Sequence, residues 1–157
     1  MRNYAPAILT LATLAGGCAL LKGLPAGSSR ILAQKIVEEV KAAHSEITGL
    51  ELAATRSAAE GCKTIAATEA NEVGEKCDQD ELTAIQTNKP FVEREKDEFD
   101  VTLPIHDSAG RIIGTAGMDF KAERGQTKET VTRQAKQIAA ELEKRIPSRE
   151  KLFEPAR

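Results

Sequence analysis

The sequence predicts an α+β fold with one five-stranded antiparallel sheet, a long N-terminal helix, a short middle helix and a C-terminal helix. Apolar residues recur every three or four positions over residues 32–44 and 127–145, which is typical of amphipathic helices. Short apolar runs separated by turn residues lie between these segments and indicate strands. The clearest two, 101–105 and 111–120, flank the turn residues 107–110 (Asp-Ser-Ala-Gly), which predicts an antiparallel hairpin.

The N-terminal half supplies the first helix and two strands. Ser28 and Ser29 are favourable N-caps for the helix. The apolar stripe of the helix is formed by Leu32, Ile36, Val37, Val40 and Ala43. Residues 47–55 and 62–67 alternate loosely between apolar and polar side chains, and we therefore expect them to form two strands.

A short helix follows at Asp78, where Glu81 stands three places on and completes a capping box. Its apolar residues Leu82 and Ile85 are expected to face the core. Pro90 ends the helix, and residues 91–94 form a third short strand.

The C-terminal helix is predicted from about Thr127 to Arg145, and Pro147 terminates it. One stripe of this helix carries its apolar residues, namely Val131, Ala135, Ile138, Ala139, Leu142 and Ile146. The remaining residues, 148–157, are short of apolar side chains, and we expect a flexible tail.

The first 27 residues have the layout of an export signal. Arg2 precedes a charge-free run of 18 residues from Tyr4 to Leu21. The run is long enough to remain as a membrane anchor. Cleavage near Ala26 and lipidation at Cys18 are the alternatives. The expected organisation is therefore a signal peptide or anchor at 1–27, a folded domain at 28–147 and the tail. The protein is expected to be periplasmic or anchored at the outer face of the membrane.

Cys62 and Cys77 form an even pair in a chain with an export signal, which predicts a disulfide bond between them. The sequence has no CxxC or HxxxH spacing, so we expect no metal site and no cofactor. The net charge of −2 and the aromatic content of 3% argue against nucleic acid as a partner.

Two stretches resemble the Cache domains, which are PAS-like extracytoplasmic sensor modules of bacteria. They are DVTLPIHDSAGRIIGTAGMDF, residues 100–120, and GCKTIAATEANEVGEKCDQDELTAIQTNKPFVERE, residues 61–95. The resemblance covers roughly residues 30–146 and implies a PAS-like sheet on which the short helix roofs a ligand pocket. Cache receptors usually continue into a second membrane helix and an output domain. The sequence shows neither, so we do not expect a complete receptor.

Strand alternation places Thr102 and His106 on one sheet face, together with Thr115 and Asp119 of the next strand. These polar groups among apolar ones fit a small-molecule site, although a face open to water would carry similar residues. Asp119 is the strongest candidate, because the resemblance implies an acidic ligand contact in the last strand. Further candidates near the roof are Arg56, Lys63 and Thr64.

We find no paired nucleophile and base, and thus expect a sensor-type module that binds a small molecule without catalysis. The resemblance and the polar face are compatible with an amine or an organic acid as ligand. The alternative is a structural or interaction protein on a PAS-like scaffold, which dimerises through its terminal helices. The N-terminal segment is the one expected contact with a membrane.

Overall fold

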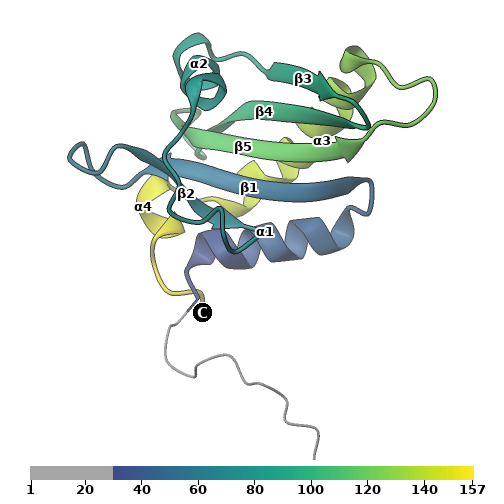
Figure 1. The fold of residues 1–157 in the computed structure, drawn as a ribbon. Coiled ribbons are helices and arrows are strands. Elements are labelled where there is room, and N and C mark those ends of the chain that lie inside the picture. The colour runs from purple at the N-terminus through teal and green to yellow at the C-terminus, as the bar shows by residue number, and fades with distance from the viewer. Residues whose placement is uncertain (1–29) are drawn as a thin grey trace, which may run out of the picture.

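Five strands form one antiparallel sheet in the order β2-β1-β5-β4-β3. They are β1 (Ile47–Thr55), β2 (Cys62–Ala67), β3 (Phe91–Glu95), β4 (Glu98–His106) and β5 (Ile112–Lys121). The computed structural model describes residues 30–157, so the predicted export segment lies outside the described residues. β5 lies at the centre of the sheet and pairs with both β1 and β4 (Figure 1). The predicted α+β class and the hairpin are confirmed.

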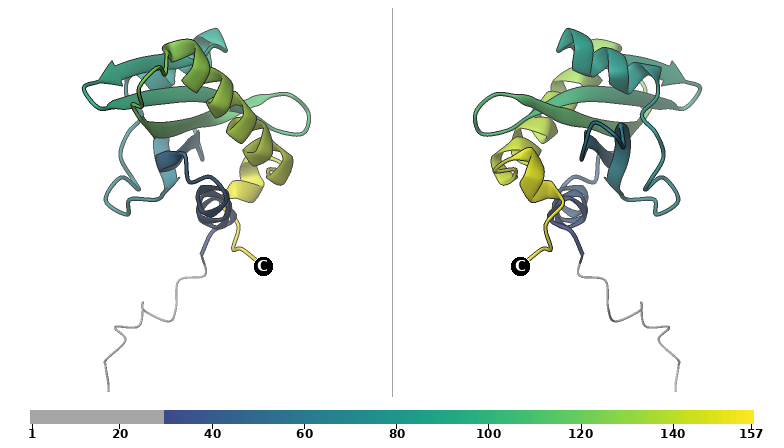
Figure 2. Two further views of the ribbon diagram at one scale, coloured as in Figure 1. Left: turned by 90° about the vertical axis from the view of Figure 1, so that its right-hand side faces the viewer. Right: turned by 90° about the vertical axis from the view of Figure 1, so that its left-hand side faces the viewer.

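Two long helices, α1 (Leu32–Ala43) and α3 (Lys128–Arg145), pack on one face of the sheet and contact each other (Figure 2). The core lies between them and the strands, and on β5 it includes Ala116, Met118 and Phe120. The predicted stripe of α3 is buried from Val131 to Ile146, and the helix starts where it was predicted, with Thr127 as its N-cap. In residues 30–157 no helix combines the length and the hydropathy that a membrane span requires.

The short helix α2 (Gln79–Thr87) lies on the opposite face, where it contacts β3, β4 and β5. Its capping box between Asp78 and Glu81 is present as predicted. The predicted inward position of Leu82 is wrong, because this side chain is 37% exposed while Glu81 and Ala84 are buried. One oxygen of the Glu81 carboxylate accepts from the Asp78 amide at 2.9 Å, and the other accepts from Thr115 of β5 at 3.3 Å, so Glu81 lies toward the sheet.

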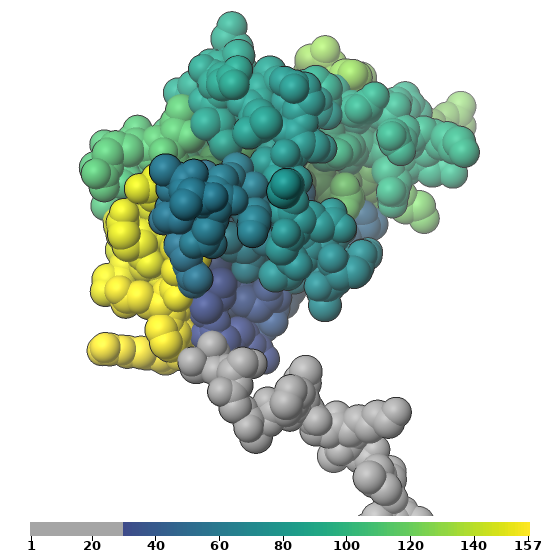
Figure 3. Space-filling view, turned by 60° about the vertical axis from the view of Figure 1, so that its left-hand side comes forward, coloured from purple at the N-terminus to yellow at the C-terminus, as the bar shows by residue number. Residues whose placement is uncertain are grey.

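Residues 148–157 pack on the domain, in contrast to the flexible tail that we predicted. They contain the helix α4 (Arg149–Leu152), in which Leu152 is buried. The following residues pair with the chain that enters α1, since the Leu32 amide donates to the Glu154 carbonyl at 2.8 Å. Figure 3 shows the C-terminal segment in yellow against the purple α1. One buried leucine and these backbone hydrogen bonds hold a segment whose polar composition suggested disorder.

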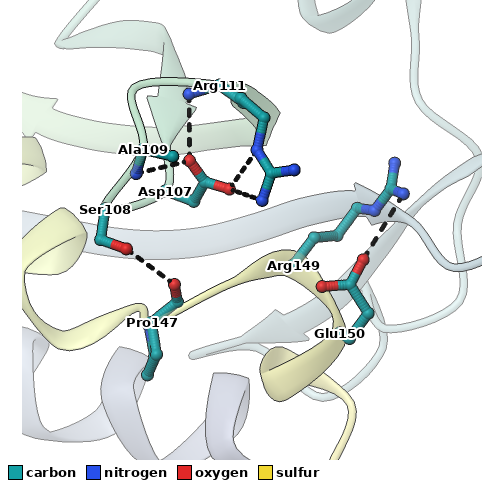
Figure 4. Close-up of polar contacts among 7 residues, drawn as sticks. All are labelled: Asp107, Ser108, Ala109, Arg111, Pro147, Arg149 and Glu150. Carbon is teal, nitrogen blue, oxygen red and sulfur yellow. Dashed lines mark hydrogen bonds and ion pairs between the residues drawn. The ribbon is translucent and has the colours of Figure 1, made fainter.

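The β4–β5 turn is fixed by the carboxylate of Asp107 (Figure 4). Oδ1 accepts from the backbone amides of Ala109 and Arg111, at 2.9 and 3.0 Å. Oδ2 accepts from the Arg111 guanidinium at 2.6 Å, and these hydrogen bonds lower the pKa of Asp107. Ser108 donates to the Pro147 carbonyl at 3.1 Å, so the turn is also attached to the connection between α3 and α4.

Cys62 and Cys77 form the predicted disulfide bond. It attaches the loop 68–77 along the outer edge of β2. The Thr64 amide donates to the Glu75 carbonyl at 3.0 Å, and the Gly74 amide donates to the Thr64 carbonyl at 2.9 Å. The loop therefore covers an edge strand that would otherwise expose unpaired backbone groups.

Replacing both Cys62 and Cys77 by serine should lower the free energy of unfolding by about 3 kcal/mol, because the disulfide closes a loop of 15 residues in the unfolded chain. Urea denaturation of the variant and of the oxidised wild type measures the difference. Reduced wild type serves as the control and should match the variant. Equal stability of oxidised and reduced wild type would contradict the stabilising role of this bond.

Candidate functional site

Four carboxylates gather on the sheet face opposite α1 and α3, and we call this surface the acidic face. Glu51 comes from β1, Asp119 from β5, Asp100 from β4, and Glu81 reaches the face from α2. Glu81 is 7% exposed, Glu51 and Asp119 are half-buried, and Asp100 keeps access to solvent. Side chains of this type are rarely buried without a partner, so their concentration on one surface requires an explanation.

Cross-strand register explains how the sheet accommodates these acids. Asp119 pairs with Gly49 of β1 and with Asp100 of β4, while Glu51 pairs with Gly117. A Cβ atom on Gly117 would lie 2.6 Å from Glu51 Oε1, and one on Gly49 would collide with the Asp119 carboxylate. The carboxylates of Glu51 and Asp119 thus each lie over a glycine of the neighbouring strand, in space that any other residue would fill.

Hydroxyl and amide groups satisfy part of this cluster. Thr64 donates to Glu51 at 3.1 Å, and Thr115 donates to Glu81 at 3.3 Å. Among residues 30–157, no lysine, arginine or histidine forms an ion pair with any of the four acids. The negative charge of the acidic face is therefore not neutralised within the described part of the chain.

Burial, with the charge of nearby acids, raises the pKa values of all four groups. Burial, followed by the charge of Glu81, raises the pKa of Glu51 to about 7. Although Asp100 is partly open to water, desolvation by its neighbours and the charge of Asp119 raise its pKa to about 6. Burial is also the main cause of the raised pKa values of Asp119 and Glu81. At neutral pH the cluster is consequently close to taking up or releasing a proton.

The structure brings together three of the residues that the sequence predicted. Asp119, Thr115 and Thr102 all lie on the acidic face, where Thr102 pairs with Gly117 and is 5% exposed. Residues 30–157 contain no group of three potential ligands arranged to hold a metal ion.

His106 does not join them. The β4–β5 register shifts between Ile105 and His106, and this irregularity ends the simple alternation on which the prediction depended. Nδ1 of His106 lies 2.7 Å from the Glu143 carboxylate of α3, and Nε2 lies 3.0 Å from Asn88. The imidazole thus connects the end of β4 to α3, away from the acidic face.

Arg56 and Lys63 also lie elsewhere, beside the β1–β2 turn. Lys63 pairs with Ala54, a residue of the helix-covered side of β1. The Arg56 guanidinium lies over the Phe153 ring, 4.8 Å from its centroid. Thr64 stands between the two regions, since its hydroxyl reaches Glu51 while both neighbours in β2 face the other way.

Sequence reasoning missed Glu51, Glu81 and Asp100. The signal for Asp100 was available, because it is two places before Thr102 and shares its face. Glu51 could be recognised only from the register that sets it opposite Gly117. Glu81 was interpreted as a capping residue, and its second carboxylate oxygen was free to reach Thr115.

Comparison with solved structures identifies the fold. The GAF domain of nlh2 from A. aeolicus, in an inactive state, has a TM-score of 0.54 at 10% identity, covering 74% of this chain and 82% of that one. A GAF sensor protein from Burkholderia vietnamiensis has a TM-score of 0.55 at 12% identity, with 78% and 81% covered. The chain has a GAF-like fold. No protein-family model and no curated protein matches the sequence.

A third solved structure widens the range of functions found on this fold. It is the type II free methionine-R-sulfoxide reductase from Thermoplasma acidophilum, with a TM-score of 0.50 at 16% identity, covering 76% of this chain and 91% of that one. GAF folds are related to PAS and Cache folds, so the predicted five-stranded α+β architecture is confirmed at the level of the fold. Membership of the Cache family stays a prediction.

Substituting the two central glycines of β5 should have different effects. A Cβ at Gly114 would lie 3.0 Å from the Ala53 carbonyl carbon, and the backbone of β1 cannot withdraw without breaking its pairing. Gly114→Ala should therefore lower the free energy of unfolding by about 1–3 kcal/mol. Gly117→Ala meets only the flexible Glu51 carboxylate, so it should destabilise less and should move that carboxylate toward water. Urea denaturation, with an NMR titration of Glu51, tests both; equal destabilisation would contradict this difference.

Glu51 should make the protein less stable as pH rises. Below pH 4.5 the carboxyl is protonated in both states; above it the unfolded chain ionises freely, whereas the folded protein retains the proton up to about pH 7. The free energy of unfolding should thus fall across this window by up to about 3 kcal/mol, less the effect of partial exposure.

Glu51→Gln should remove this loss and be more stable than wild type at pH 8. Denaturation at several pH values measures the slope, and Glu123→Gln, on an exposed loop residue, is the matched control. An unchanged slope in Glu51→Gln would show that burial does not hold the proton on this group.

Proposed function

We propose that the protein is an exported, non-catalytic sensor-type module of GAF-like fold that binds a small organic cation on its acidic face. The observation that supports this most directly is the set of four carboxylates without an ion-pair partner among residues 30–157. A ligand with a protonated amine would supply the missing charge. Its positive charge would also reduce the repulsion between Glu51 and Glu81, which protonation of a carboxylate otherwise reduces.

The arrangement of the acidic face suits recognition of an ammonium group. Asp119 and Asp100 are cross-strand neighbours, and the hydroxyl groups of Thr102 and Thr115 lie on the same face. Carboxylates around an ammonium group make charge-assisted hydrogen bonds, each contributing roughly 1.5–3 kcal/mol. An organic acid would instead add a further negative charge, so of the two ligand classes predicted from the sequence this face favours the amine.

Two further features support export and binding without catalysis. The predicted signal at residues 1–27 and the disulfide between Cys62 and Cys77 both fit an oxidising compartment. In residues 30–157 these cysteines are bonded to each other, and neither histidine lies beside a hydroxyl or thiol nucleophile. Of the structural neighbours described above, one is a GAF domain and one is a GAF sensor protein. Cache membership is part of the same proposal, with the resemblance of residues 61–95 and 100–120 as its support.

A thermal-shift screen of the purified, oxidised protein against amino acids, aliphatic amines and organic acids tests the ligand class. We expect amines to raise the melting temperature and organic acids to leave the acidic face unaffected. Stabilisation should be greatest above pH 7, where the Glu51 carboxylate is ionised. If no amine raises the melting temperature, the proposed function is wrong, and the alternative of a structural or dimerisation module gains support.

Asp119→Asn should weaken binding of the most effective amine by about ten- to a hundredfold, because a lost charge-assisted hydrogen bond corresponds to roughly 1.5–3 kcal/mol. Its effect on melting temperature should be small, since the half-buried carboxylate has no ion-pair partner in residues 30–157. Calorimetric titration measures the affinity, and Asp97→Asn in the exposed β3–β4 turn is the control. A large fall in melting temperature with unchanged affinity would assign Asp119 a structural role.

A further inference from the structure

A second concave region lies beside β2 on the helix-covered side of the sheet, opposite the acidic face. It is a cavity of about 170 Å³ bounded by the β1–β2 turn, by β2, by the loop at Gly74, and by Ile31 and Phe153 from the two ends of the domain. Its apolar walls come from Ile31, Ile65 and Phe153, all of which pack on the core. The cavity has about the volume of a site that accommodates a benzene ring, for which about 150 Å³ suffices.

Arg56 and Lys63 line this cavity, and within residues 30–157 neither forms an ion pair with an acid. The Arg56 guanidinium is held against the Phe153 ring at 4.8 Å, so its N–H groups stay available at the edge of the stack. One acid, Glu60, also borders the cavity. Its side chain is exposed and accepts a hydrogen bond from Ser57 at 3.2 Å, so it lies at the rim.

The backbone places a third cation beside these two. Lys63 and Lys76 are partners in an antiparallel bridge, so their side chains leave the strands on the same side. Like charges in such a position repel each other. The adjacent residues are Cys62 and Cys77, whose disulfide holds the two lysines in register despite this repulsion. Two cations, Arg56 and Lys63, therefore line the cavity against one acid, Glu60, and Lys76 lies beside Lys63 in the neighbouring segment.

We propose that this cavity is a second ligand site, which binds a small carboxylate with an apolar body. The carboxylate would lie between Arg56 and Lys63, and the body would lie against Phe153 and the isoleucines. Arginine offers carboxylates a planar pair of donors, and a bound anion would remove the repulsion between Lys63 and Lys76. The site differs from the acidic face in charge, in ligand class and in the side of the sheet that it occupies.

Benzoate and benzamidine provide a matched pair of probes, since they share size and shape and carry opposite charges. The oxidised full-length protein is titrated with each at pH 7.5 and followed by NMR. Benzoate should bind saturably and shift the resonances of Ile31 and Phe153. Benzamidine should leave these resonances unchanged. Absence of saturable benzoate binding, or shifts confined to other regions, would overturn the proposal.

Three substitutions test the assigned contacts. Lys63→Gln and Arg56→Gln should each weaken benzoate binding by about tenfold or more, whereas Lys89→Gln, on an exposed lysine of the α2–β3 turn, should not. Circular dichroism and melting temperature establish that the variants are folded. Benzoate binding that is insensitive to both Lys63→Gln and Arg56→Gln would refute the site.

The same experiment separates this proposal from the amine site. Asp119→Asn should weaken binding of amines without affecting benzoate. Loss of every amine response with intact benzoate binding would overturn only the proposed function. The reverse result would overturn only the carboxylate site.

Discussion

The pairing of β5 with both β1 and β4 is the constraint on which the rest of the structure depends. Side chains alternate along this strand, so Ala116, Met118 and Phe120 enter the core under α1 and α3 while Thr115 and Asp119 face the other way. A slip of one residue would exchange the two sets and bury Asp119 among apolar side chains. Because that exchange would be strongly unfavourable, core packing fixes the register of β5 and with it the position of the acidic residues. The register that buries Phe120 also places Asp119 over Gly49.

The charges of the acidic face lower the stability of the folded protein. Desolvated carboxylates that lie close together destabilise the folded state, and the raised pKa values of Glu51 and Asp100 express this penalty as a tendency to bind protons. A sheet optimised for stability alone would carry threonine or valine at such positions. The glycines opposite Glu51 and Asp119 give up side-chain packing to make room for them. Both features, the desolvated carboxylates and the glycines opposite them, destabilise the folded protein. The proposed cationic ligand would offset this loss of stability, whereas ordinary exposed acids need neither desolvation nor glycine neighbours.

The features that sequence analysis predicted correctly are those that neighbouring residues determine. Apolar spacing located α3, the capping box located the start of α2, and turn residues located the β4–β5 hairpin. Errors arose where distant segments decide. The irregularity after Ile105 moved His106 to α3, and the hydrogen bond from Thr115 of β5 holds Glu81 against the sheet in place of Leu82. Of the candidate site, Asp119, Thr115 and Thr102 were placed correctly by alternation. Glu51 became visible only once the register of β1 with β5 was known.

The loop 68–77 borders both proposed sites, because the charge of Asp119 acts on Glu72 while Gly74 lines the cavity that contains Arg56 and Lys63. Thr64 connects the two sides, since its hydroxyl binds Glu51 and its backbone binds Glu75 and Gly74 of the loop. The disulfide removes much of the conformational freedom that the loop would otherwise lose on binding. Reduction would restore that freedom, and each ligand would then have to order the loop at the expense of its own affinity. If either ligand orders this loop, the ligand that binds first lowers the entropic penalty for the ligand that binds second. Coupling between the sites should consequently be stronger in the reduced protein than in the oxidised one, where the loop is already held.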